Sequence, residues 1–129
     1  MIEIVIPGVP IGQGRIRAAC VNGKPRLYDP KKSREWKEMA RDIIGRYARR
    51  CEFIKKPQAI GVDIEAVFMR PKSNKTTDHI QKPDIDNIVK IVMDCMTGLI
   101  MEDDSQIVSV NANKSWGKGD YVRFSWGVV

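Results

Sequence analysis

Residues 84–99 read DIDNIVKIVMDCMTGL, and this stretch predicts a helix that is buried on most of its sides. Apolar residues cover most of its circumference. Its polar side chains, at about 100° per residue, fall within one narrow stripe. They are Asp86, Asn87, Lys90, Asp94 and Thr97. Because an unpaired buried charge costs several kcal/mol, this stripe must face a cleft, a partner or a compensating network.

The segments upstream of this helix predict both a strand and a further helix. Residues 59–69 place apolar side chains at every second position, as expected for a strand with one dry face. Residues 31–50 repeat apolar side chains at helical spacing. Asp29 is the expected cap of that helix, and Pro30 its expected first residue. Residues 2–6 read as a short first strand.

Turn residues predict two hairpins. Asn22-Gly23 lies within residues 7–30, a stretch rich in glycine and proline. Near the C-terminus, residues 105–114 and 120–128 read as two strands that a turn at 116–119 joins into a hairpin. Strands and helices interleave irregularly along the chain. We therefore expect an α+β fold, with a mixed β-sheet packed against two main helices in one domain that spans the whole chain.

The chain is basic overall. Its 129 residues include 22 Lys and Arg against 16 Asp and Glu, which gives a formal charge of +6 and a pI near 9.4. This surplus favours a polyanionic partner. Cys20, Cys51 and Cys95 are widely spaced and predict reduced thiols in a cytoplasmic protein. We expect neither a signal peptide nor a membrane-spanning segment.

Acidic residues flank the buried helix at both ends. Asp84 and Asp86 open it, and Asp104 closes an acidic cluster that follows it. Carboxylate oxygens are the ligands that Mg²⁺ prefers. If the next strand runs beside residues 59–69, we expect Asp104 to reach the same corner, where the three carboxylates hold one or two ions next to a scissile phosphate. Lys90, one turn further, would contact a phosphate oxygen or orient a water.

The same residues permit a purely structural interpretation. Aspartates in a first helical turn cap free amide groups and complement the helix dipole. Asp86 with Lys90, and Lys90 with Asp94, are also ordinary i,i+4 ion pairs. Glu102-Asp103-Asp104 is equally typical of a solvated turn. From these residues alone, a metal site and a set of capping and surface charges both stay open.

The combined pattern resembles the RusA family of Holliday junction resolvases, a family common in prophages. The resemblance is closest over residues 84–108, in the D-x-D-N sequence at 84–87, the lysine and aspartate further along the helix, and the D-D-x-x-V-type segment that follows it. It extends more loosely to Gly14–Arg17 and Tyr28–Pro30, which are similar to the basic G-R-x-R and Y-x-P elements of phage members.

This resemblance implies a Mg²⁺-dependent endodeoxyribonuclease that hydrolyses phosphodiester bonds. Such an enzyme acts as a homodimer and cuts four-way DNA junctions with paired nicks in recombination and repair; Mn²⁺ can replace Mg²⁺, and no organic cofactor is needed. Asp84, Asp86 and Asp104 match the metal ligands of the family, and Lys90 matches its essential lysine. Asp103 is the alternative to Asp104. A two-fold dimer would suit the approximate two-fold symmetry of a junction.

Two basic loops flank the carboxylates in sequence and are predicted to contact phosphates. The predicted contacts are Arg15, Arg17, Lys24, Arg26, Arg70, Lys72, Lys75 and Lys82. We expect the loop at 70–82 to be mobile without DNA. Its His79 could act as a general acid or base, although a lone loop histidine usually does neither. Two other functions stay open: a non-catalytic basic nucleic-acid-binding module, and a metal nuclease acting on flaps or other branched DNA.

Overall fold

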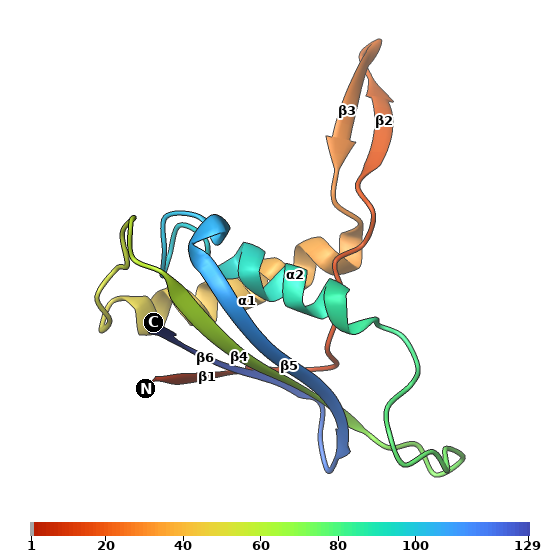
Figure 1. Cartoon of the computed structure of the whole chain (residues 1–129). Helices are drawn as coiled ribbons and strands as arrows, with labels where there is room; N and C mark the ends of the chain where they lie inside the picture. The colour runs from red at the N-terminus through yellow and green to blue at the C-terminus, as the bar shows by residue number, and fades with distance from the viewer. Residues whose placement is uncertain (1) are drawn as a thin grey trace.

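A four-stranded sheet carries two helices on one of its faces in the computed structural model, which describes residues 2–129 (Figure 1). This arrangement confirms the expected α+β fold with a mixed sheet and two main helices. The elements are β1 Glu3–Pro7, β2 Arg17–Val21, β3 Lys24–Tyr28, α1 Lys31–Ala48, β4 Ile60–Met69, α2 Ile85–Met96, the short 3₁₀ helix η1 Asp104–Gln106, β5 Ile107–Gly117 and β6 Tyr121–Val128.

The strand order in the main sheet is β1-β6-β4-β5, so the predicted C-terminal hairpin is wrong. β4 lies between β5 and β6; it pairs parallel with β5 and antiparallel with β6. Val67 and Phe68 are both buried although they point to opposite faces of the sheet, which suits a central strand. The chain crosses the end of β4 on its way from β5 to β6, where Asp120 Oδ1 accepts the Met69 N–H at 2.8 Å.

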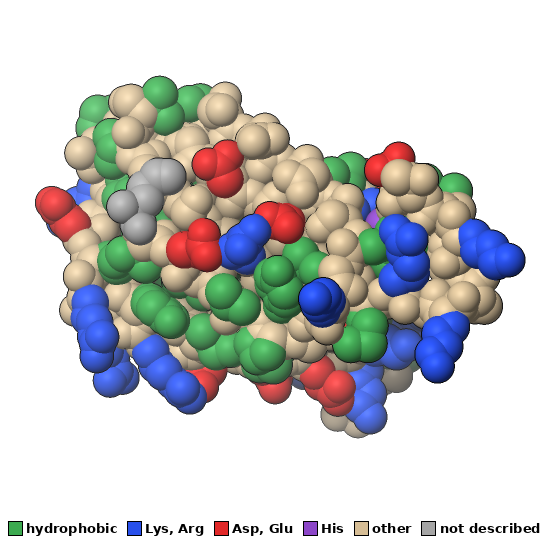
Figure 2. All heavy atoms as spheres, turned by 90° about the horizontal axis from the view of Figure 1, so that it is seen from below, with side chains coloured by type: hydrophobic (Ala, Val, Ile, Leu, Met, Phe, Trp, Pro, Cys, Tyr) green, Lys and Arg blue, Asp and Glu red, His purple; other side chains and the backbone are tan. Residues whose placement is uncertain are grey.

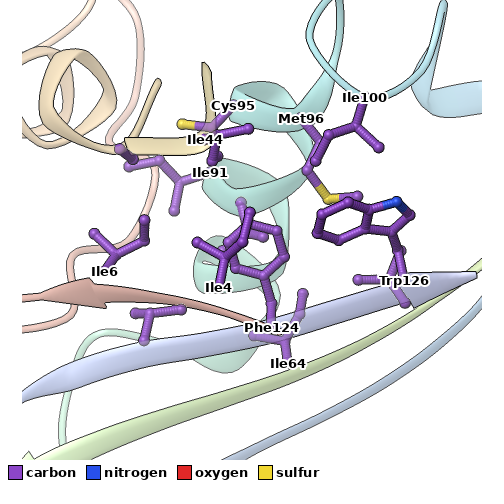
Figure 3. Packing of buried hydrophobic residues seen from close by; sticks show 14 of the residues in the cluster. Ile4, Ile6, Ile44, Ile64, Ile91, Cys95, Met96, Ile100, Phe124 and Trp126 are labelled. Carbon is purple, nitrogen blue, oxygen red and sulfur yellow. The ribbon is translucent and has the colours of Figure 1, made fainter. Parts of the chain in front are cut away.

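The core lies between the sheet and the two helices. Figure 3 shows Phe124 of β6 and Ile4 of β1 pointing from the sheet toward the helix layer, where Ile91 and Met96 of α2 meet them. All four side chains are at most 1% exposed. The apolar side chains predicted for α2 therefore pack mainly into a core within the chain. This burial fixes how the helix is rotated about its axis.

Arg41 of α1 holds the C-terminal end of α2. Its Nη1 donates to the carbonyl oxygens of Asp94, Cys95 and Thr97 at 3.4, 3.2 and 3.0 Å. These carbonyls belong to the last turn, where a helix has no amide partners of its own and where a cation complements the dipole. The orientation of α2, and of the acidic residues at its ends, thus depends on α1.

The beginning of α1 differs from the prediction. Pro30 is the N-cap residue and the helix starts at Lys31, with no side chain capping its first amides. Asp29 instead pairs with Lys37 Nζ at 2.9 Å and accepts a hydrogen bond from Gln13 Nε2 at 3.3 Å. The hydrogen bond from Lys37 lowers the pKa of Asp29. Asp29 therefore ties the loop before β2 to α1 rather than capping the helix.

The predicted hairpin at Asn22-Gly23 is confirmed and forms a separate arm. Among residues 2–129, strands β2 and β3 pair only with each other, and the arm stands away from the body (Figure 1). Asn22 and Gly23 have φ values of 52° and 74°, as a two-residue type I′ turn requires. Most side chains of the arm are exposed on both faces. No helix in the described part of the chain is long and apolar enough to cross a membrane.

The thiols differ enough in burial to be told apart chemically. Cys95 is fully buried, and desolvation raises its pKa to about 12, whereas Cys20 lies exposed on the arm. Because only an accessible thiolate reacts, iodoacetamide at pH 8 is expected to modify Cys20 in the native protein and to spare Cys95. Mass spectrometry of tryptic peptides measures this, with denatured protein as the control in which both react. Native labelling of Cys95 at the rate of Cys20 would contradict the buried position.

Candidate metal-binding and nucleic-acid site

The N-terminal end of α2 presents two uncommitted carboxylates, meaning carboxylates without a hydrogen bond or an ion pair. Asp84 is the N-cap residue and its backbone oxygen accepts the Ile88 N–H at 3.2 Å, but its side chain caps no amide. Asp86 lies in the first turn and is exposed. Within residues 2–129, neither side chain has a hydrogen-bond or ion-pair partner. The capping interpretation therefore does not account for Asp84, and both groups are available to a ligand.

In the part of the chain that the structure describes, Lys90 is also free, because the i,i+4 ion pairs suggested by the sequence do not form. Asp94 pairs instead with Lys37 of α1, at 3.6 Å between Oδ2 and Nζ. Lys90 is exposed and lines a groove together with Asp94 and Arg15, at the base of the arm. Its ammonium group is thus placed one helical turn from Asp86 with no protein partner in the described part of the chain.

The structure distinguishes the two candidate aspartates beyond α2. Asp103 accepts a hydrogen bond from the Ser105 hydroxyl and pairs with Lys56 Nζ at 3.6 Å. The Ser105 hydrogen bond, with help from Lys56, lowers the pKa of Asp103. Its backbone N–H also donates to Gln106 Oε1 at 3.0 Å. Asp104 is exposed and, among residues 2–129, makes no such contact. Asp103 is therefore a structural residue, and Asp104 is the uncommitted one.

Within residues 2–129, Asp104 does not meet Asp84 and Asp86, so the expected convergence of the three carboxylates at one corner is wrong within one chain. No group of three potential metal-ligating side chains gathers anywhere in residues 2–129. β5 does run beside β4 as expected, but its start, where Asp104 lies, is next to the C-terminal end of α2. The 12-residue helix, about 18 Å long, separates the two acidic positions.

The candidate metal ligands at the N-terminal end of α2 are therefore suitable for Mg²⁺, but the set is incomplete. Two neighbouring carboxylates with no competing partner suit a hard cation such as Mg²⁺, which keeps several waters and takes few protein ligands. Asp84 and Asp86 would hold such an ion, and Asp104 of the same chain would not reach it.

The segment leading into Asp84 is anchored from two sides. Lys114 of β5 donates from Nζ to the carbonyl oxygens of Gln81 and Pro83, at 2.8 and 3.0 Å. His79 is only 6% exposed and stacks on Phe68, with ring centroids 3.8 Å apart. The loop at 70–82 thus has a packing residue that the sequence interpretation did not recognise, and its last part is pinned to the sheet.

His79 lies in an environment that keeps its side chain neutral. Burial, with a contribution from Lys114, lowers the pKa of His79, which suits a neutral packing side chain rather than an exposed acid or base.

Lys114 was not predicted as a functional residue at all. It could have been found, because it interrupts the apolar series Val110, Ala112 and Trp116 on the helix-facing side of β5.

The register of the arm separates its residues into two faces. Directly opposed residues of an antiparallel pair share a face, and the three cations fall on the same one. On this cationic face Arg17 lies opposite Tyr28, Arg26 opposite Ala19 and Lys24 opposite Val21. The opposite face is apolar and consists of Ala18, Cys20, Pro25 and Leu27.

The predicted basic contacts of the central loop are less uniform. Arg70 lies 5.7 Å from the ring centroid of Trp116 and donates to the Thr77 carbonyl at 3.3 Å, so it is partly used within the protein. Lys72, Lys75 and Lys82 are exposed. These three lysines remain available to bind phosphates, and so do Arg15 and the cations of the arm.

The open face of the sheet, opposite the helices, carries the wrong charge for DNA. Glu3, Asp63 and Glu65 line a shallow depression there, and Arg123 pairs with both Glu65 and Glu3. Figure 2 looks onto this face and shows acidic side chains gathered around one cation. A polyanion is therefore expected on the side of the helices and the arm.

The chain matches a known protein family over most of its length. The family described as Endodeoxyribonuclease RusA matches residues 7–123, which include both helices and all the candidate site residues. The chain is also similar to the "Uncharacterized protein YqaN" of Bacillus subtilis (strain 168), with 31% identity over an alignment that covers 91% of this chain and 89% of that protein.

Proposed function

Because the chain belongs to the RusA endodeoxyribonuclease family, we propose that it is a Mg²⁺-dependent nuclease that resolves four-way DNA junctions by paired nicks as a homodimer. Its role would be recombination and repair in the cytoplasm, in a prophage-type setting. The observation that carries the proposal is the pair of uncommitted carboxylates, Asp84 and Asp86, beside a free Lys90. A helix end built only for stability would use the side chain of its N-cap aspartate to bind a free amide, and Asp84 does not.

Each candidate site residue would have a different role in the hydrolysis of the phosphodiester bond. A bound Mg²⁺ would neutralise charge on the scissile phosphate and lower the pKa of a coordinated water. Asp84 and Asp86 would hold the ion at the N-terminal end of α2. Lys90 lies one turn along the helix and would donate to a non-bridging phosphate oxygen, where negative charge grows as water attacks phosphorus and the bond to a sugar oxygen breaks.

The distribution of charge supports a defined path for the DNA. Arg15 and Lys90 line one groove, and the cationic face of the arm begins two residues further, at Arg17. Phosphate contacts of this kind fix register and orientation without reading sequence. The proposed path therefore runs from the N-terminal end of α2 past Lys90 to the arm.

A substrate panel tests the proposal and its alternatives. End-labelled four-way junction, flap, duplex and single-stranded DNA are each incubated with Mg²⁺ at equal salt. We expect symmetrical nicks near the branch point of the junction, with a preference that persists at salt concentrations that remove non-specific binding. Binding without cutting in Mg²⁺ or Mn²⁺ would identify a non-catalytic binding module. Preferential cutting of flaps would identify a different branched-DNA nuclease.

Lys114 is predicted to position Asp84 for metal binding. Lys114→Met removes both donated hydrogen bonds to the segment 81–83, so we expect affinity for Mn²⁺ to fall about tenfold, as for other residues that orient metal ligands. Electron paramagnetic resonance of free Mn²⁺ measures this directly. Lys114→Arg should recover part of the affinity, and Lys118→Met, in the exposed turn before β6, is the charge-matched control. Wild-type Mn²⁺ affinity in Lys114→Met would contradict the positioning role.

A further inference from the structure

The Asp94 carboxylate lies one helical turn beyond Lys90 on α2, and Lys37 of α1 pairs with it. We propose that Lys37 is a positioning residue: by pairing with Asp94 it keeps that carboxylate away from Lys90, so that the Lys90 ammonium group stays available to a phosphate. This inference rests on the proposed function, which gives Lys90 its part in phosphate binding. It assigns α1 a part in the reaction, although α1 carries none of the candidate site residues.

Asp94 has two possible cationic partners. Lys90 precedes it by four residues, so the two side chains are about 40° apart around the axis of α2 and lie on one face. Both line the groove at the base of the arm. The ion pair nevertheless forms with Lys37, whose Nζ is 3.6 Å from Asp94 Oδ2. The contact between the two helices is therefore formed in place of the local pair within α2.

Lys37 is held in place by a second carboxylate and by burial. Its Nζ donates to Asp29 Oδ2 at 2.9 Å, and its side chain is only 19% exposed. α1 begins where the arm rejoins the body, so Asp29 lies at the junction of the arm and the helix (Figure 1). A lysine already fixed in this way loses little side-chain freedom on pairing, and its charge is less screened by water. Asp94 therefore pairs with Lys37 rather than with the exposed Lys90.

Without Lys37, the Asp94 carboxylate would lose its ion pair. Its side chain is 37% exposed, so it is partly desolvated and an unpaired charge there is unfavourable. Lys90 is the cation in the i,i+4 relation to it. A Lys90 ammonium paired with Asp94 would have to exchange that partner for a phosphate oxygen, and the charge of Asp94 would repel the phosphate. Loss of Lys37 should therefore slow the chemical step through Lys90.

A direct contact between Lys37 and DNA is the alternative, because Lys37 also lines the groove. Such a contact would require its ammonium group to exchange two carboxylates for a phosphate. The two roles differ in their salt dependence. Loss of one phosphate contact lowers the slope of log affinity against log salt by about 0.9 on duplex DNA, whereas loss of a positioning residue leaves the slope unchanged.

Rescue at a second site tests the inference. Lys37→Met is expected to cleave a four-way junction about fivefold more slowly in single turnover, the upper range for an ion pair of this exposure, with the salt slope of binding unchanged. Lys37→Met combined with Asp94→Asn should cleave at the rate of Asp94→Asn alone, because no carboxylate is left to pair with Lys90. Lys37→Arg should keep the wild-type rate. Lys31→Met, at an exposed position of the same helix, is the charge-matched control and should also cleave at that rate.

The reactivity of Lys90 provides a measurement that needs no DNA. In competitive labelling with a trace of acetic anhydride, an ion-paired amine reacts more slowly than a free one, and mass spectrometry of the digested protein quantifies each lysine. Labelling of Lys90 should slow by about fivefold in Lys37→Met and should return to the wild-type rate when Asp94→Asn is added. The exposed Lys32 is the internal reference. Lys37→Gln, which still carries a donor for Asp29, repeats the test should the methionine variant not fold.

The outcomes separate this inference from the proposed function. Unchanged labelling of Lys90 in the Lys37 variants would overturn the positioning role, and so would a double variant that cleaves as slowly as Lys37→Met. A salt slope reduced by about 0.9 would assign Lys37 to a direct phosphate contact and would also overturn it. If the wild type does not cut junctions, the proposed function fails, and the labelling of Lys90 still decides whether Lys37 keeps Asp94 away from it.

Discussion

Asp86→Asn is expected to reduce cleavage of a four-way junction by about 10³-fold, a loss near 4 kcal/mol of transition-state stabilisation. The amide cannot supply the charged oxygen that a hard cation prefers. Because the Asp86 side chain is exposed and has no partner in residues 2–129, the fold should be unaffected. Single-turnover rates in Mg²⁺ measure the loss, and gel shifts in Ca²⁺ measure binding, which should be retained because a negative charge has been removed next to DNA.

The control for this variant carries the same change of charge elsewhere. Asp42 of α1 is exposed and pairs with Arg46 at the surface, so Asp42→Asn should cleave at the wild-type rate. Cleavage by Asp86→Asn within tenfold of wild type would show that Asp86 is not a metal ligand. Loss of junction binding in that variant would instead assign it a structural or binding role.

The elements of the fold follow closely from local sequence patterns. The helix α2 and the strand β4 have a strong periodicity of apolar residues. The arm has the turn pair Asn22-Gly23, and both of these residues adopt the positive φ that a type I′ turn requires. The pairing of β5 and β6 was predicted wrongly because proximity in sequence favours a hairpin. β4 lies between β5 and β6 because both of its faces are buried. That burial depends on tertiary packing, which the turn residues at 116–119 do not reveal.

The candidate site shows the same division between local and long-range information. The sequence identified Asp84, Asp86 and Lys90 because they are close together on one helix. It could not show that Asp104 lies a full helix length away, because the distance depends on the direction in which α2 crosses the sheet. The anchoring of residues 81–83 by Lys114 was equally hidden, since it joins segments about thirty positions apart.

Removing the cationic face of the arm is expected to weaken DNA binding more than any other surface change. In the variant with Arg17, Lys24 and Arg26 all replaced by alanine, three potential phosphate contacts on one face are lost, so the slope of log affinity against log salt should fall by about 2.7 for duplex arms. A two-stranded ribbon of this kind is narrow enough to follow the major groove. The carboxylates are untouched, so binding of Mn²⁺ should remain at the wild-type level.

The two faces of the arm provide the decisive comparison. Leu27→Ser changes the apolar face without altering charge, and it should leave the salt dependence as it is in the wild type. Fluorescence anisotropy of a labelled junction at several salt concentrations measures both variants. If the two variants changed the salt slope equally, the arm would act through its own folding rather than through its charges. If neither did, the DNA would follow another surface, and the exposed lysines at 72, 75 and 82 would be the next to replace. The expected result, a reduced slope for the cationic face alone, would show that the arm binds the sugar-phosphate backbone while α2 supplies the metal ligands.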